Sequence, residues 1–228
     1  MRRVILPLVA AAVMAFPAPA MAQLERITNR EAVAGLKAAL ERGSQAAVAS
    51  LGRADGFLGN PRVRIPLPES LQRTEKLMRR VGVGRYADEL VTAMNRAAES
   101  AVPEARQMFV SAVKTMSVQD AKAILSGGDT AGTDYFRRRT RPPLHKRFLP
   151  IVKAATAKVR LAQTYDRYAA KGLALGVVKK EHADLDEYVT QKALDGLYLM
   201  VAEEEKKIRK DPVRAGSSII KKVFGALR

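Results

Sequence analysis

Apolar residues recur along most of this chain at intervals of three and four positions, with polar and charged residues between them. This spacing places apolar side chains on one side of an α-helix, whereas a half-buried β-strand needs strict alternation of apolar and polar residues. No β-branched run alternates for long enough to indicate a sheet. We therefore predict an all-α protein, a single compact bundle of about eight helices with no sheet.

Glycines, prolines and capping residues mark where the helices should begin and end. The predicted helices cover residues 30–51, Pro68 to about 80, 86–102, a stretch restarted at Pro103, 118–126, a stretch capped by Asp129 and Thr130, about 144–168, and 184–210, followed by a last short amphipathic segment at 217–227. Pro142 and Pro143 separate two of these helices in the prediction, because proline removes a backbone donor from a helix interior. Asp184 with Glu187 three residues later is typical of a capping box, and we expect that helix to be central.

Residues 53–68 are rich in Gly and Pro, so we expect a loop. The loop also holds five large apolar residues, which would dock it across one end of the bundle: Phe57, Leu58, Val63, Ile65 and Leu67.

The first residues are typical of a cleaved signal peptide. Arg2 and Arg3 precede a short apolar stretch, and Ala20, Met21 and Ala22 form a small-x-small cleavage pattern. We predict a signal peptide at residues 1–22 cut after Ala22, a single helical domain at 23–228, and a C-terminal amphipathic segment at 211–228. The mature chain is expected to be soluble and periplasmic or otherwise exported, since no later segment is apolar for long enough to span a bilayer.

The chain is strongly basic, with 40 Lys and Arg against 23 Asp and Glu and a formal net charge of +17. Loss of Arg2 and Arg3 with the signal peptide leaves most of this charge on the folded domain. The anionic partners available to an exported protein are anionic lipid, lipopolysaccharide and acidic proteins. Nucleic acid is not expected, because it is scarce outside the cytoplasm.

The charge is concentrated in one stretch, residues 135–165, which has nine Lys or Arg and no Asp or Glu. The predicted anion-binding residues are Arg137, Arg138, Arg139, Arg141, Lys146, Arg147, Lys153, Lys158 and Arg160. The alternative is that these cations pair with acids of other helices, including those at 203–205. The sequence leaves both open.

The C-terminal segment also allows two arrangements. Its apolar and basic residues could face a membrane, with Ile219, Ile220, Lys221, Lys222, Val223 and Phe224 in the interface. Alternatively the segment folds back and covers the bundle, as terminal helices often do.

Catalytic chemistry has little support in the sequence. There is no cysteine, and the two histidines, His145 and His182, accompany no nucleophile motif. We predict no catalytic residue, no cofactor and no metal site. The best candidate for a cation site is the set Asp184, Asp186 and Glu187. These residues lack the spacing of a calcium loop, and helix capping explains Asp184 and Glu187.

Residues 126–130, Ser-Gly-Gly-Asp-Thr, precede a predicted helix and could cradle a phosphate. A helix end followed by a new helix explains them better, because the Gly-Lys-Ser/Thr of a P-loop is missing.

Several strings resemble one known family. They are GFLGNPRVRIPLPESLQ at 56–72, MNRAAESAVPEA at 94–105, DAKAILSGGDTAGTDYFRRRT at 120–140, FLPIVK at 148–153 and DLDEYVTQKALDGLYLMVAEEEKKIR at 184–209. Together they resemble the domain of unknown function 4197 family of exported bacterial proteins, over nearly all of the mature chain. The resemblance implies no activity and no catalytic residue.

Three hypotheses for the function follow. The first is a non-enzymatic envelope protein that binds an anionic surface or acidic partner through the basic stretch. The second is a carrier holding a small apolar ligand between helices, which would need an apolar interior pocket. The third is a carboxylate-based hydrolase or metal enzyme, which would need acids that converge in a cleft.

Overall fold

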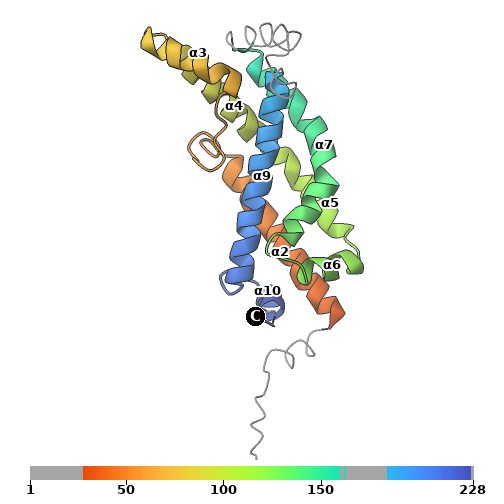
Figure 1. Cartoon of the computed structure of the whole chain (residues 1–228). Coiled ribbons are helices and arrows are strands. Elements are labelled where there is room, and N and C mark those ends of the chain that lie inside the picture. Colours follow the sequence, from red (N-terminus) through yellow and green to blue (C-terminus); the bar gives the residue numbers. More distant parts are fainter. Residues whose placement is uncertain (1–27, 160–161, 163–183, 227–228) are drawn as a thin grey trace, which may run out of the picture.

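The computed structural model describes residues 28–159, 162 and 184–226, and within these residues every regular element is a helix (Figure 1). The helices are α2 (Asn29–Leu51), α3 (Glu69–Arg80), α4 (Arg85–Ala101), the 3₁₀ helix η1 (Val102–Glu104), α5 (Ala105–Lys114), α6 (Val118–Leu125), α7 (Ala131–Thr156), α9 (Leu185–Lys210) and α10 (Ser218–Ala226). The prediction of an all-α fold is confirmed. The predicted signal peptide lies outside the described residues.

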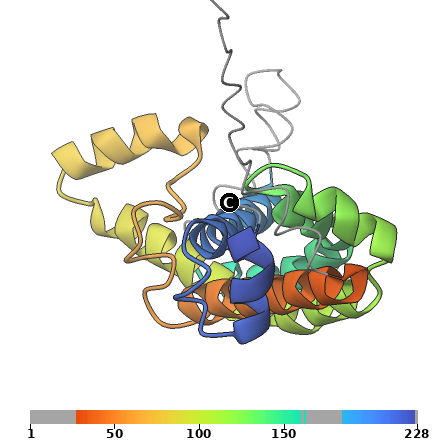
Figure 2. The ribbon, with the colours of Figure 1, turned by 90° about the horizontal axis from the view of Figure 1, so that it is seen from below.

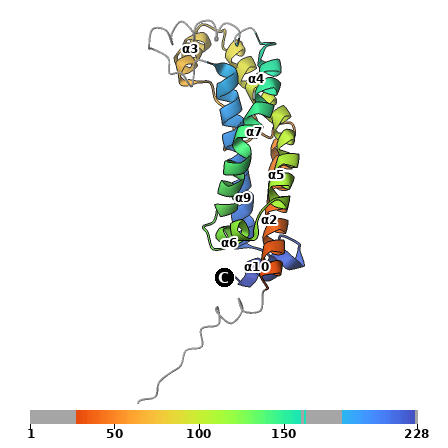
Figure 3. The same cartoon turned by 90° about the vertical axis from the view of Figure 1, so that its right-hand side faces the viewer.

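The long helix α9 lies at the centre, as predicted, and packs against α7, α2 and α4 (Figures 1 and 3). Its buried face includes Leu194, Leu197 and Val201. Helix α5 packs on both α2 and α7. The small-residue face of α4, with Ala97, Ala98 and Ala101 fully buried, fits this close packing.

Local capping sets several of the helix starts. Ser117 and Asp120 form the reciprocal capping box of α6, and Thr28 and Glu31 form another at α2. At α9 the box is only half formed. The Asp184 side chain accepts the Glu187 backbone N–H, while the Glu187 carboxylate turns away to other partners.

Helix α7 corrects one prediction, because it runs without a break through Pro142, Pro143 and Pro150. All three prolines are exposed. The carbonyls that they leave without a donor belong to Arg138, Arg139 and Lys146, which are exposed residues, so water can satisfy them. The helix expected to start at Asp129 and Thr130 and the helix expected at about 144–168 are therefore one helix up to Thr156. The remainder of the second lies largely outside the described residues.

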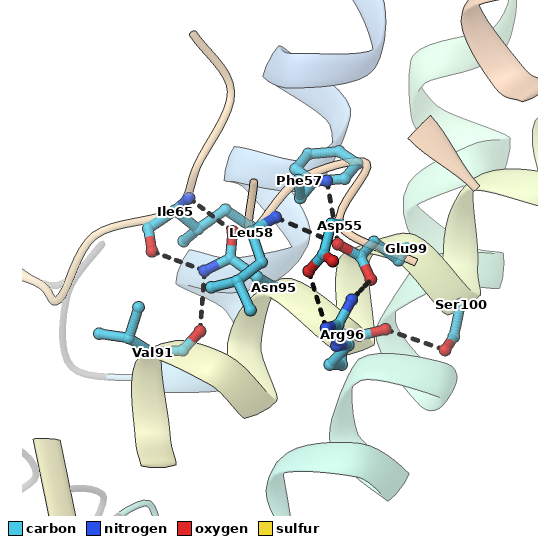
Figure 4. A network of polar contacts seen from close by, with 9 residues as sticks. All are labelled: Asp55, Phe57, Leu58, Ile65, Val91, Asn95, Arg96, Glu99 and Ser100. Carbon is cyan, nitrogen blue, oxygen red and sulfur yellow. Dashed lines mark hydrogen bonds and ion pairs between the residues drawn. The ribbon is translucent and has the colours of Figure 1, made fainter. Parts of the chain in front are cut away.

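The 53–68 loop packs on the bundle, but along the side of α9 and against α4 rather than across one end as expected. Phe57, Val63, Ile65 and Leu67 are buried, and the Phe57 ring packs so closely on Gly196 of α9 that a Cβ there would lie 2.8 Å from it. Two polar side chains of α4 hold the loop backbone (Figure 4).

Asn95 bonds both the N–H and the C=O of Ile65, at 2.8 and 2.9 Å. The buried carboxylate of Glu99 accepts the N–H groups of Phe57 and Leu58 at 3.0 and 3.1 Å. These bonds satisfy loop backbone groups that water cannot reach.

Two elements lie at the margins of the bundle. Helix α3 stands away from the other helices, joined to α4 by a tight turn (Figure 2). Helix α10 packs across the outside of α2 at the opposite end. In the part of the chain that the structure describes, no helix combines the length and the hydropathy needed to cross a bilayer.

Candidate anion-binding surface

The outer side of α7 carries a row of cations. Arg139, Lys146 and Lys153 follow one another at intervals of seven residues, about two helical turns, so they share one exposed face. Arg138 is exposed beside them. We call these four residues the α7 ridge.

Most of the other predicted anion-binding residues turn elsewhere. Arg141 points to α9, where it bonds Asp195 at 2.8 Å and Gln191 at 2.6 Å. The Arg137 guanidinium lies over the Tyr198 ring, 5.3 Å from its centroid. Arg147 bonds Glu104 of η1 at 3.1 Å. Lys158 is exposed just beyond the end of α7, and Arg160 lies outside the described residues.

The acids at 203–205 were the alternative partners expected for the basic stretch. Among the described residues they pair with other cations instead. Glu203 pairs with Arg62, Glu204 with Lys207 and Glu205 with Arg209. The acids that do reach the stretch come from other positions: Asp120, Asp195 and Glu104.

Pairing leaves the ridge largely uncompensated. Arg139 contacts Asp120 at 3.9 Å, close to the limit for an ion pair, and its side chain is 62% exposed. An exposed pair of this kind contributes about 0–1 kcal/mol and is weakened by salt. Within the described residues, neither Lys146 nor Lys153 has an acidic partner. The ridge therefore presents positive charge to solvent.

Beside the ridge lies an open groove of about 270 Å³ between α5 and α7, lined in part by Met108, Ser111, Arg139 and Thr140. A second open groove, of about 760 Å³, lies between α2, α9 and the segment that follows α9. Arg42 and Lys210 line it, together with the ion pairs Lys207–Glu204 and Arg214–Asp211.

The N-terminus of α7, considered above as a phosphate cradle, is filled by the protein itself. The Glu205 carboxylate accepts the N–H groups of Gly132 and Thr133, at 3.0 and 2.8 Å, and the Thr133 hydroxyl at 2.8 Å. Arg209 bonds the same carboxylate at 3.0 Å. The anion that this helix start favours is thus supplied by α9.

The three carboxylates of the candidate cation site each bind different partners and share none. Asp184 caps α9, and Asp186 accepts the Thr156 hydroxyl. Glu187 lies 2.9 Å from His145 Nε2 and accepts the Gln191 amide at 2.7 Å. Burial opposes ionisation of Glu187, but the hydrogen bonds from Gln191 and His145 outweigh it and lower its pKa. His182 lies outside the described residues.

No group of three or more His, Cys, Asp or Glu side chains in the described part of the chain is arranged to hold a metal ion. A cavity between α2, α9 and α10 is lined by Leu36, Val201 and Phe224 among other residues. This cavity is too small for an apolar ligand. It holds about 10 Å³, whereas ligand pockets have volumes of roughly 300–1,000 Å³.

A buried tyrosine joins α7 and α9. Tyr198 is fully buried, its hydroxyl lies 2.7 Å from that of Thr140, and burial raises its pKa to about 12. Its protonated hydroxyl and its ring hold the two helices together beneath Arg137.

The C-terminal segment docks on the bundle. Ile220, Val223 and Phe224 are buried, and Lys222 bonds Glu31 of α2 at 2.6 Å. Lys221 is exposed and Ile219 is half-buried. In this arrangement the apolar side of α10 faces α2 and is not available to a membrane.

Sequence reasoning missed the roles of Glu205, Asn95 and Glu99. A signal was present for Glu205, which lies four residues after Val201 and three before Ile208, on the apolar face of α9. A carboxylate at such a position needs hydrogen-bonding partners inside the protein.

One family model matches the chain over residues 26–225, the family described as protein of unknown function (DUF4197). No curated protein and no solved structure matches the chain. The match spans nearly the whole sequence and agrees with the resemblance in the quoted strings. The chain therefore belongs to the DUF4197 family.

Proposed function

We propose that this protein is a non-enzymatic component of the bacterial envelope that binds an anionic surface or an acidic partner through the α7 ridge. The observation that carries the proposal is the exposed row Arg139, Lys146 and Lys153 on one face of α7, with Arg138 beside it. Export to the periplasm, expected from residues 1–22, is part of the proposal.

The physical basis is electrostatic. A lysine or arginine close to an anionic lipid surface contributes about 1 kcal/mol of binding free energy. The long-range field of the mature chain, whose formal net charge falls from +17 to +15 once Arg2 and Arg3 are removed, also favours encounter with such a surface. A rigid helix holds the ridge cations in one row, so they can engage the surface together.

The test is charge reversal of the ridge. The triple variant carries Arg138→Glu, Lys146→Glu and Lys153→Glu. Its affinity for phosphatidylglycerol vesicles, measured by flotation, should be at least about a hundredfold lower than that of the wild type, because three contacts of about 1 kcal/mol are lost. Far-UV circular dichroism and urea unfolding would establish that the variant is folded.

The matched control reverses three exposed cations elsewhere: Arg30→Glu, Arg42→Glu and Lys206→Glu on α2 and α9. It changes the net charge by the same amount and includes Arg42 of the larger groove. The control should bind far better than the ridge variant. Equal loss in both variants would mean that net charge alone drives binding and would contradict a role for the ridge.

A further inference from the structure

The turn between α3 and α4 gathers exposed apolar side chains among arginines. Residues 79–86 read RRVGVGRY, with three arginines and no acid. Val81 is 65% exposed, and Val83 and Tyr86 are each 38% exposed. Among the large apolar side chains that the structure describes, half of the exposed ones are these three. We call residues 79–86 the arm tip.

The arm tip has a defined shape. Arg79 bonds Glu75 of α3 at 2.8 Å and Asp88 of α4 at 2.5 Å, so one guanidinium ties the two helices together. Gly82 adopts a φ of +78°, a conformation that favours glycine, and a Cβ on Gly84 would lie 2.9 Å from Arg79 Cγ. The Arg85 guanidinium lies over the Tyr86 ring and bonds its hydroxyl at 3.1 Å.

We propose that the arm tip is a shallow anchor that inserts Val81, Val83 and Tyr86 into the headgroup region of an anionic bilayer. The inference rests on the proposed function, and it names the anionic surface as lipid. Tyrosine favours the membrane interface, and Arg80 and Arg85 can keep their charged ends at the phosphates while their stems lie in the apolar region. Arg79 is held by Glu75 and Asp88.

Two observations favour lipid over a protein partner. Three apolar side chains on a narrow turn offer far less than the roughly 800 Å² per partner that a stable protein interface buries, whereas a bilayer takes up a small apolar tip flanked by cations. The arm also lies at the same end of the molecule as the C-terminal end of α7, which carries Lys153 (Figures 1 and 3). A bilayer at that end can meet the arm tip together with the Lys153 end of the α7 ridge.

The chain contains no tryptophan, so a single introduced Trp reports its own surroundings. The experiment compares Val81→Trp with Val118→Trp, because Val118 is similarly exposed, at 55%, but lies on α6. With phosphatidylglycerol vesicles, the fluorescence of the Val81→Trp variant should shift to shorter wavelength and be quenched by acyl-chain-brominated lipid. The fluorescence of the Val118→Trp variant should do neither.

The second arm of the experiment is flotation of Val81→Asp/Val83→Asp against Val118→Asp. The double variant should bind at least about tenfold more weakly than wild type, since apolar contact is replaced by desolvated charge, and the control should bind like wild type. If the Val81→Trp variant floats with vesicles while its emission stays that of a water-exposed Trp, the anchor is overturned and the proposed function stands.

A blue shift of the Val81→Trp variant without vesicles, accompanied by dimer formation in size-exclusion chromatography, would overturn the anchor in favour of a second copy of the chain. If wild type fails to float with anionic vesicles at all, the lipid surface and the anchor are both overturned.

Discussion

At the scale of single residues, the structure depends on a few buried polar groups that join distant parts of the chain. Glu205 is the clearest case, because one carboxylate caps α7, holds Arg209 and is itself buried. The arrangement satisfies N–H groups of α7 that no residue of its own first turn caps. Its removal would leave both these donors and a half-buried arginine without a partner.

We predict that Glu205→Ala lowers the free energy of unfolding by about 3–5 kcal/mol, the usual cost of removing one partner of a buried ion pair. The adjacent substitution Glu204→Ala is the control. Glu204 forms only an exposed pair with Lys207, so its loss should cost less than about 1 kcal/mol. Urea unfolding of the two variants measures both values, and equal costs would contradict the capping role of Glu205.

The pH dependence of stability should report the bonds to Glu187. Its pKa lies below the ordinary value of 4.5 in the folded protein, so its ionised form stabilises the fold above that pH. The contribution is lost as pH falls through the lowered pKa, where the folded state also binds the proton. Glu187→Gln should therefore be less stable than wild type at neutral pH, with a difference that shrinks in acid. A difference independent of pH would show that the charge of Glu187 contributes nothing.

Sequence alone could not supply these residue roles. The run Glu203, Glu204 and Glu205 is typical of a solvated helix face, and only the register of the helix against α7 separates the buried carboxylate from its neighbours. Asn95 and Glu99 lie within an alanine-rich helix, and their loop partners are 30 and more residues away. Tertiary contacts of that separation leave little pattern in one sequence.

At the scale of elements, glycines of α2 set where other helices can approach. A Cβ on Gly35 would lie 2.5 Å from Val223 Cγ2 and 3.0 Å from the backbone oxygen of Ile219, so α10 sits directly on this glycine. A Cβ on Gly43 would meet Glu204 and Ile208 at 3.5 Å, an ordinary contact distance. The two glycines share a helix and are both buried, yet only one is needed for packing.

Alanine substitutions should separate the two glycines. Gly43→Ala should stabilise the protein by up to about 1 kcal/mol, because alanine favours the helix. Gly35→Ala should destabilise it by about 1–3 kcal/mol through overpacking against α10. Thermal unfolding of both variants measures the difference in sign. Stabilisation by Gly35→Ala would mean that α10 does not dock as described.

The boundaries of most elements could be predicted, because capping residues and glycines act locally. Ser117 with Asp120 starts α6 as expected, and Gly52 ends α2. The continuity of α7 could not be predicted. Whether Pro142 and Pro143 break a helix depends on where their orphaned carbonyls point, and the bundle directs that side of α7 to solvent.

At the scale of the whole molecule, periodicity was enough to predict an all-α fold around the 185–210 helix. The Gly, Pro and large apolar residues of the 53–68 loop were enough to predict that it packs on the bundle. It could not divide the basic stretch into cations that pair with α9 or η1 and cations that remain exposed. That division follows from the rotation of α7 against its neighbours, which places Arg141 inward and Lys146 outward. The α3–α4 arm was not foreseen as a projection either, since its length and composition suit a packed helix equally well.

The most direct test of the central claim is flotation of the wild-type protein with phosphatidylglycerol and with phosphatidylcholine vesicles over a salt series. An exposed cationic ridge predicts binding to the anionic vesicles alone, with affinity that falls steeply between about 0.05 and 0.5 M salt, as screening shortens the reach of its charges. Equal binding to both kinds of vesicle, or binding to the anionic ones that salt leaves unchanged, would contradict the account.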